Sequence, residues 1–267
     1  MRIHDTEMHP LGLVDLAAST AGGLVLWSSD EFFADASNLL EPKAAVFDPD
    51  RYTDRGKWMD GWESRRRRSP GHDSAIIELG ISGCVRMFNI NTAHFTGNYP
   101  AFARVWGCYA PTAKLTDLRT KTKWIDLGPS VALKGGSSNW ITCRYEGELT
   151  HLKLDIYPAG GVARLRAYGD AARSDTRRQV NLIGEETGAR AIACSDMYFS
   201  EMHNLLKSTP AKDMGDGWET KRSRPPGDDW VVIQLGHLGC PKTLVIDTAY
   251  FKGNYPQCFA VDAILWP

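Results

Sequence analysis

The chain repeats one of its own segments. The stretch DGWESRRRRSPGHD at residues 60–73 returns as DGWETKRSRPPGDD at residues 216–229. Over the wider ranges 60–100 and 216–256, 22 of the 41 aligned positions are identical and the register never slips. Upstream, SDEFFADASNLL matches SDMYFSEMHNLL at an offset that is ten residues larger, so the first copy carries ten extra residues between the two segments. Self-similarity of this kind indicates a duplicated structural module, and we therefore predict two homologous domains.

Each copy has the residue pattern of β-strands. SAIIELG and WVVIQLG are short apolar runs bounded by glycine, and CVRMFNINTAHF and CPKTLVIDTAYF are longer β-branched and aromatic segments. In the first copy, HLKLDIYPAGGVARLRAY alternates apolar and polar residues beside a turn at 158–161, which is the pattern of an antiparallel hairpin. Many short strands separated by glycine and proline turns favour an all-β protein with two tandem jelly-roll β-sandwich domains.

The domain boundaries follow from the ends of the repeat and from changes in composition. The second copy is incomplete, because Pro267 aligns with Pro111 and nothing in it matches residues 112–169 of the first copy. A sandwich that lacks those strands has an unpaired edge and an exposed apolar face. We therefore expect an N-terminal segment, a first domain, a polar linker and a second domain truncated at its C-terminus, at residues 1–26, 27–170, 171–193 and 194–267.

Charge and hydropathy exclude several classes of partner. Lys and Arg number 31 against 32 Asp and Glu, so no overall field attracts nucleic acid or an anionic membrane. No window approaches the roughly 18 apolar residues of a membrane span, and the N-terminus lacks the features of a secretory signal. The six cysteines are widely spaced, without CxxC pairs or zinc-finger spacing. We expect a cytoplasmic protein with no metal, no cofactor, no nucleic-acid partner and no membrane partner.

The arginine run contains a repeated pair. Arg66 and Arg68 recur in the second copy, whereas Arg67 is replaced by Ser223. Residues two apart share a face of an extended segment, so the repeated element is an R-x-R pair that points one way. Three interpretations stay open: ion pairs with neighbouring carboxylates, a fork that holds a small carboxylate bidentately, and a nucleic-acid contact, which the neutral overall charge disfavours.

The acidic residues and the histidines differ in whether both copies keep them. Glu63 and Asp73 recur in the second copy, and either a shared fold or a shared chemistry accounts for that. His72 and His94 occur in the first copy only. Because histidine exchanges protons near neutral pH, His72 is the candidate proton-transfer group, with Glu63 or Asp73 to orient it. The competing interpretation for each histidine is an ordinary structural hydrogen bond.

The motifs YTDRGKWMDGWESRRRRSPGHD, TAHFTGNYP and YPAGGVARLRAYG, with GDGWETKRSRPPGDDW and IDTAYFKGNYP in the second copy, resemble the allantoicase family over nearly the whole chain. The resemblance implies paired jelly rolls related to galactose-binding-like sandwiches, assembly into homo-oligomers, and hydrolysis of allantoate to ureidoglycolate and urea in purine breakdown. The chain departs from the family pattern at Ser74, where tryptophan is common, at Asn91, which replaces an aspartate, and in the missing end of the second domain.

The reaction implied by this resemblance breaks the bond between the central carbon of allantoate and one ureido nitrogen. Such a step needs an acid that protonates the departing nitrogen, a base that activates water, and a cation that fixes the substrate carboxylate. The arginines suit the carboxylate, and Asn98 suits a ureido group. On these chemical grounds the expected catalytic residues are His72, Glu63 and Asp73, and the expected substrate-binding residues are Arg66, Arg68, Asn98 and His94.

Two other functions are compatible with the sequence. Tandem jelly rolls also hold sugars or other small ligands without altering them, so fold alone does not distinguish a binding protein from an enzyme. The incomplete second copy is compatible with an inactive remnant, or with a chain that works only beside a full-length partner. Release of urea from allantoate by the purified protein separates an enzyme from a binding protein.

Overall fold

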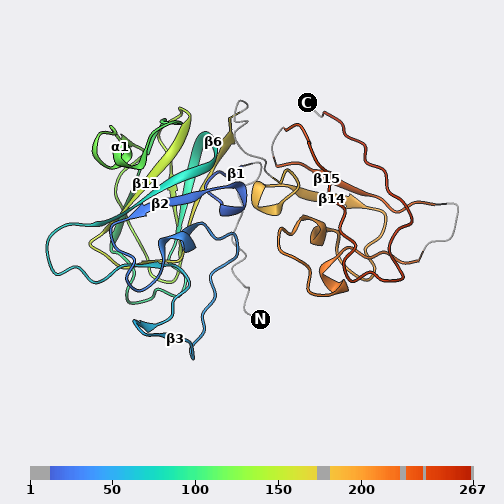
Figure 1. Ribbon diagram of the computed structural model, residues 1–267, viewed down its shortest axis with the longest axis horizontal. Helices are drawn as coiled ribbons and strands as arrows, with labels where there is room; N and C mark the ends of the chain where they lie inside the picture. The colour runs from blue at the N-terminus through green and yellow to red at the C-terminus, as the bar shows by residue number, and fades with distance from the viewer. Residues whose placement is uncertain (1–12, 173–180, 223–226, 237–238, 266–267) are drawn as a thin grey trace. The chain divides into compact units, whose positions relative to one another are not determined.

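The chain forms two compact units that consist mainly of strands and loops. The computed structural model describes residues 13–172, 181–222, 227–236 and 239–265 (Figure 1). One unit comprises residues 1–189 with 235–239, and the other comprises residues 190–234 with 240–267. Among the described residues there is one α-helix, α1 (Leu115–Thr120), and no helix long and apolar enough to cross a membrane. The all-β prediction is confirmed, while the domain boundaries expected from the sequence stay predictions.

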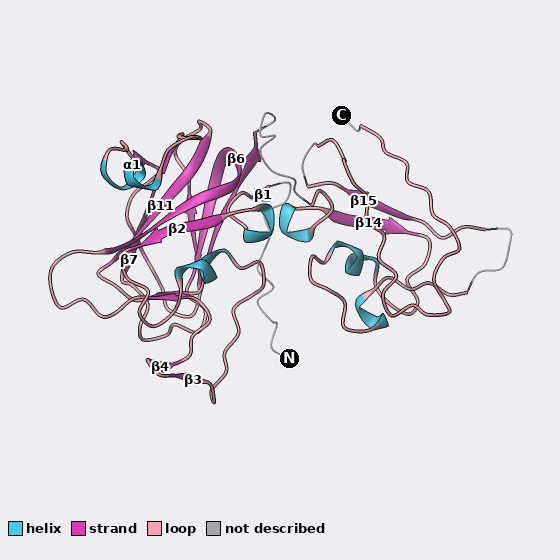
Figure 2. Ribbon diagram, viewed as in Figure 1, coloured by secondary structure: helices cyan, strands magenta, loops and turns pink. Residues whose placement is uncertain are grey.

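The first unit holds most of the regular structure (Figure 2). Besides α1 it has the 3-10 helices η1 (Ser19–Ala21), η2 (Ala36–Leu40) and η3 (Glu185–Thr187). Its strands are β1 (Val14–Asp15), β2 (Leu24–Ser28), β3 (Tyr52–Thr53), β4 (Gly56–Lys57), β5 (Trp62–Glu63), β6 (Asp73–Asn91), β7 (Phe102–Cys108), β8 (Ile125–Asp126), β9 (Val131–Ala132), β10 (Ser138–Thr142), β11 (Leu149–Tyr157), β12 (Gly161–Val162) and β13 (Arg164–Ala171).

The long strand β6 belongs to both layers of the first unit. Its first half, up to Glu78, pairs with β2 on one side and β11 on the other. Its second half, from Met87 to Asn91, pairs with β10 and β13 instead. β7 extends the first layer from β11, and β1 extends the second from β13. All of these pairings are antiparallel, so one strand connects two antiparallel layers into a sandwich.

The two layers enclose a single apolar core. Ile77 from the first half of β6 and Ile90 from its second half are both fully buried in the same cluster. On β11, Leu152, Leu154 and Ile156 enter this cluster at alternate positions, as the two-residue period of a strand requires. Full burial of one such side chain stabilises the folded state by roughly 1.5–3 kcal/mol. The β-sandwich expected for the first repeat is therefore confirmed.

The expected hairpin between the strands around residues 158–161 is wrong in its pairing. Both strands exist, as β11 and β13, but each pairs with a different half of β6 and they do not pair with each other. The connection between them crosses from one layer to the other and contributes β12, which pairs with β5. Alternating hydrophobicity identifies a strand but not its neighbour, so the sequence pattern did not distinguish a hairpin from a crossing between layers.

The second unit begins with the same strand pairing as the first. It contains β14 (Arg190–Cys194), β15 (Val231–Gln234) and the 3-10 helices η4 (Met202–Leu206) and η5 (Met214–Asp216). β14 pairs with β15 at the positions equivalent to those of β2 and β6: Cys194 lies opposite Val231 as Ser28 lies opposite Ala75. The register shift within this pair also falls at equivalent residues in both units. The duplication seen in the sequence is therefore a duplication of structure.

Beyond β15, the second unit exposes residues whose counterparts form the core of the first. Leu244 and Ile246 are 50% and 47% exposed, and Val261 is 61% exposed. The equivalent residues of the first unit are at most 4% exposed, and they lie on β6 and β7. Within residues 239–265 the structure has no strand. In the first unit, β10, β11 and β13 pair with the strands that carry these positions.

Candidate active site

The short strand β5 presents Glu63 beside Asn98. Trp62 is fully buried and donates from its indole nitrogen to the backbone oxygen of Asp30 at 2.8 Å, which anchors the strand. On the neighbouring strand β12, Gly161 lies opposite Glu63 in an antiparallel pairing. The Asn98 Nδ2 donates to Glu63 Oε1 at 2.6 Å. The structure therefore brings together two of the residues that the sequence predicted for the site.

The environment of Glu63 favours its protonated form. Burial raises the pKa of this carboxyl above its ordinary value of 4.5, and the hydrogen bond from Asn98 opposes that change. A raised pKa brings a carboxyl closer to the range in which a general acid or base works best. The second unit repeats the pair, with Asn254 Nδ2 2.6 Å from Glu219 Oε1, so the geometry belongs to the repeat itself.

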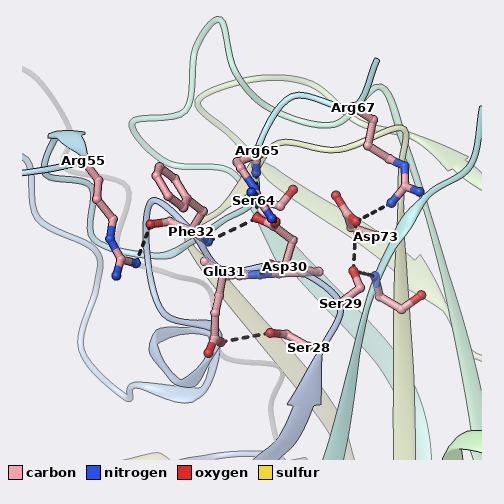
Figure 3. A network of polar contacts seen from close by, with 12 residues as sticks. Ser28, Ser29, Asp30, Glu31, Phe32, Arg55, Ser64, Arg65, Arg67 and Asp73 are labelled. Atoms are coloured by element: carbon pink, nitrogen blue, oxygen red, sulfur yellow. Dashed lines mark hydrogen bonds and ion pairs between the residues drawn. The ribbon is translucent and has the colours of Figure 1, made fainter. Parts of the chain in front are cut away.

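Asp73 is buried within a network of polar contacts (Figure 3). Its Oδ1 accepts hydrogen bonds from Ser29 Oγ at 2.9 Å and from Arg67 Nη1 at 2.7 Å. The same Arg67 nitrogen donates to the backbone oxygen of His72 at 3.0 Å. Within the described part of the chain, Asp73 Oδ2 is buried and has no hydrogen-bond partner. In this arrangement Asp73 holds the start of β6 in place.

Arg67 is the arginine of the run that enters this network, and sequence reasoning missed it. The second copy has Ser223 at its position, so comparing the two copies directed attention to the repeated pair instead. Arg66 and Arg68 are exposed. Among the residues that the structure describes, neither of them has a hydrogen bond or an ion pair. They are open to solvent, and their role as a carboxylate clamp stays a prediction.

A residue that the sequence did not indicate lies beside the His72 imidazole. Its Nε2 lies 3.7 Å from Asp155 Oδ1, and its ring lies 4.8 Å from that of Tyr157. Across the described ranges, no hydrogen bond or ion pair joins the imidazole to Glu63 or Asp73, which were the expected partners. Asp155 comes from β11, far from the arginine run in sequence, and no local motif marked it.

His94 contacts the segment that carries the ten extra residues of the first copy. Its Nε2 lies 3.0 Å from the backbone oxygen of Ala45, and its ring stacks on Phe47 with centroids 5.7 Å apart. Its φ of 67° is matched by 70° at Tyr250 in the second unit, so this backbone turn is common to both repeats. A contact between His94 and the substrate stays a prediction.

The loop from Tyr157 to Gly161 connects the pair of Glu63 and Asn98 with the surroundings of His72. At one end, Tyr157 contacts the His72 ring. At the other end, Gly161 donates to the backbone oxygen of Asn98 at 2.7 Å. The Cα atoms of residues 157 and 161 are four steps apart and so at most about 14 Å from each other. Gly160 between them has a φ of 140°, and a Cβ there would lie 2.5 Å from the Asn98 backbone oxygen, so glycine is required.

A shallow polar pocket lies beside Ser29, one of the Asp73 partners (Figure 3). Its volume is about 300 Å³. The Arg65 Nη2 forms an ion pair with Asp30 at 2.6 Å, and Arg55 donates to the backbone oxygen of Phe32. Its walls are formed by Ser28, Ser29, Asp30, Glu31, Phe32, Arg55 and Arg65. Among the described residues there is no group of three or more His, Cys, Asp or Glu side chains arranged to hold a metal ion.

The family model of the allantoicase repeat matches residues 14–172 and 180–267, which is nearly the whole chain. The chain belongs to the allantoicase family. It is 41% identical over 256 residues to a probable allantoicase of Pseudomonas syringae pv. syringae, covering 94% of this chain and 76% of that protein. A probable allantoicase of Pseudomonas paraeruginosa is 46% identical over 255 residues, with the same coverage.

Solved allantoicase structures have the same fold as this member of the family. One, described as the structure of allantoicase, superposes with a TM-score of 0.62 at 34% identity, covering 85% of this chain and 69% of that one. The allantoicase of Saccharomyces cerevisiae superposes with a TM-score of 0.59, also at 34% identity, covering 85% of this chain and 70% of that one. The tandem jelly-roll prediction and the resemblance noted from the motifs are both confirmed.

Proposed function

We propose that this protein hydrolyses allantoate to ureidoglycolate and urea in the breakdown of purines. The observation that carries the proposal is the family match over both repeats, at 41–46% identity to relatives described as probable allantoicases. The paired Glu63 and Asn98 side chains supply a proton-transfer group beside a hydrogen-bonding group for the substrate.

The reaction replaces a carbon–nitrogen bond by a carbon–oxygen bond. The bond from the central carbon of allantoate to one ureido nitrogen breaks, and that nitrogen takes up a proton and leaves as urea. The oxygen of water bonds to the same carbon, and the water gives up one proton to a base. One acid and one base are therefore sufficient, and each contributes typically 10²- to 10⁴-fold to the rate.

Glu63 and His72 are the proposed acid and base. Support for Glu63 is its raised pKa, which burial causes, and its position beside Asn98. Support for His72 is its partly exposed ring, 39% exposed in its side chain, with one nitrogen towards the buried Asp155. Asp73 is proposed to support the site through Arg67, which donates to the Asp73 carboxylate and to the backbone oxygen of His72.

Substrate binding is proposed for the remaining predicted residues. Asn98 donates to Glu63 through its nitrogen, and in the described chain its side-chain oxygen has no hydrogen bond, so that oxygen is available to a ureido N–H. Arg66 and Arg68 are exposed cations two residues apart, which suits a carboxylate. His94 is proposed as a further contact through its exposed ring.

Assembly and location complete the proposal. A homo-oligomer is proposed from the resemblance to the allantoicase family. A cytoplasmic enzyme is supported by the six cysteines, all of which are free thiols.

The test is the release of urea from allantoate by the purified protein. We expect turnover by the wild type, and a fall of about 10²- to 10⁴-fold in kcat for Glu63→Gln. Glu219→Gln removes the equivalent carboxyl from the second unit and serves as the matched control, with wild-type turnover expected. Absence of urea would refute the proposed function, and stabilisation by allantoate or a sugar without turnover would indicate a binding protein. Wild-type turnover by Glu63→Gln would remove Glu63 from the mechanism.

A further inference from the structure

A buried carboxylate on β11, Asp155, forms the centre of a cluster on the first layer of the sandwich. Its side chain is only 2% exposed. Ser74 Oγ donates to Oδ1 at 2.7 Å, and Trp106 Nε1 donates to Oδ2 at 2.6 Å. A carboxylate buried without such donors destabilises a protein strongly, and here the donors come from the strands on either side, β6 and β7. The cluster is therefore built into the sheet.

Lys153 and His72 also face this carboxylate, at distances too long for hydrogen bonds. Lys153 Nζ lies 3.6 Å from Oδ2, and His72 Nε2 lies 3.7 Å from Oδ1. The imidazole thus turns Nε2 towards the buried carboxylate while part of its ring stays exposed. Among the described residues its other nitrogen, Nδ1, has no hydrogen bond. This is the arrangement of a carboxylate that orients a histidine whose second nitrogen is open to a proton-transfer partner.

The side chains that face Asp155 occur in the first repeat and not in the second. The second repeat has Asp228, Trp230 and Asp262 at the positions of His72, Ser74 and Trp106. Other polar contacts are common to both repeats. For example, Ser195 donates to Asp229 at 2.8 Å in the second unit, as Ser29 does to Asp73 in the first. The three side chains are therefore specific to the first repeat and occur together.

We propose that Asp155 is the positioning residue of His72, which it holds with Nε2 inward while Nδ1 exchanges protons with substrate or water. This inference rests on the proposed function, which gives His72 a proton-transfer role. With Nε2 turned towards the carboxylate, Nδ1 is the ring nitrogen that remains for exchange with substrate or water.

Several other charged and titratable groups surround His72. From β11, the Tyr157 ring lies at 39° to the His72 ring, and Lys153 lies 3.6 Å from Asp155. From the segment leading into β6, Arg67 contacts the backbone of His72, and Asp73 follows it directly in sequence. From β7, Arg104 lies opposite Asp155 in the strand register and forms an ion pair with Asp126.

The decisive experiment is an NMR measurement of the His72 ring nitrogens in the wild type and in Asp155→Asn. We expect the neutral imidazole to carry its proton on Nε2 in the wild type and to lose that preference in the variant, because the carboxylate no longer faces Nε2. We also expect kcat for urea release to fall about 10- to 100-fold while KM stays within about twofold. An unchanged tautomer in a folded variant overturns the proposal, and so does a changed tautomer with unchanged kcat.

Two controls separate positioning from stability. Asp170→Asn removes an exposed carboxylate that pairs with Arg86 on the second layer, and we expect it to leave both the His72 tautomer and kcat unchanged. Nitrogen chemical shifts of the wild type provide a test that needs no variant to fold. The neutral imidazole is expected to carry its proton on Nε2, and a proton on Nδ1 instead overturns the proposal. Because neither NMR measurement needs turnover, a protein that released no urea would refute the proposed function alone.

Discussion

Neighbouring arginines in the run at residues 65–68 have different physical roles. Arg65 forms an exposed ion pair with Asp30, and such pairs contribute little to stability. Arg67 instead donates to the buried Asp73, whose carboxylate needs that donor. Arg66 and Arg68 point to solvent. One run of four like charges therefore contains a surface ion pair, a structural cation and two cations available to an anionic ligand.

Arg67→Ala is expected to lower the free energy of unfolding of the first unit by about 1–3 kcal/mol, because it leaves a buried carboxylate short of a donor. Arg66→Ala and Arg68→Ala are the matched controls, with changes within about 0.5 kcal/mol. Denaturant unfolding of the three variants compares them directly. Equal small effects at all three positions would show that the contact between Arg67 and Asp73 does not stabilise the fold.

The pKa of Glu63 allows a second test at the level of single residues, through the pH dependence of activity. Burial raises this pKa and the Asn98 hydrogen bond lowers it, so Asn98→Ala is expected to raise it further. The limb of the kcat profile that reports Glu63 then moves to higher pH, whether Glu63 acts as acid or base. Asn254→Ala in the second unit is the control and should leave the profile in place. If the limb stayed at the same pH in Asn98→Ala, Glu63 would not be the group whose titration the kcat profile reports.

The raised pKa of Glu63 also predicts how the stability of the protein changes with pH. Because the folded-state pKa of Glu63 lies above the ordinary 4.5, its contribution to stability is complete below pH 4.5 and is lost as the pH rises through the folded-state value. Unfolding of Glu63→Gln and wild type at several pH values should therefore show the variant gaining relative stability as the pH rises. A variant that lost relative stability as the pH rose would contradict the raised pKa of Glu63.

At the scale of elements, the place of the strand β6 in both layers depends on the strands with which it pairs. Its apolar runs identify a strand in the sequence, but they do not show that it spans both layers. Two glycines lie near the point where its partners change. A Cβ at Gly80 would lie 2.4 Å from the backbone oxygen of Ala21, and one at Gly83 would lie 2.3 Å from that of Asp170. The close approach of other backbone segments thus accounts for the glycines that bound the sequence motif.

For the whole molecule, the central feature is that two copies of one module have different surroundings. Ile90 and Ile246 are equivalent in sequence, yet Ile90 is 0% exposed and Ile246 is 47% exposed. The Ile90→Ala substitution is therefore expected to lower the free energy of unfolding by about 2–5 kcal/mol, as in other well-packed cores. The matched Ile246→Ala should change it by no more than about 0.5 kcal/mol. Thermal and denaturant unfolding measure both, and a comparable loss at Ile246 would indicate that another surface covers that face in solution.

The duplication, most of the strands and the family could be recognised from the order of amino acids, because periodicity, turn residues and motifs are properties of near neighbours in the chain. The pair of Glu63 and Asn98 was expected in one site, and their side chains meet. The partners of β11 and β13, the role of Arg67 and the contact of His72 with Asp155 required the folded arrangement. Asp155 and Ser74 are 81 residues apart and meet only because β11 and β6 pair in one particular register. Register depends on the packing of the whole sandwich, so contacts across strands follow from the tertiary structure and not from any local pattern.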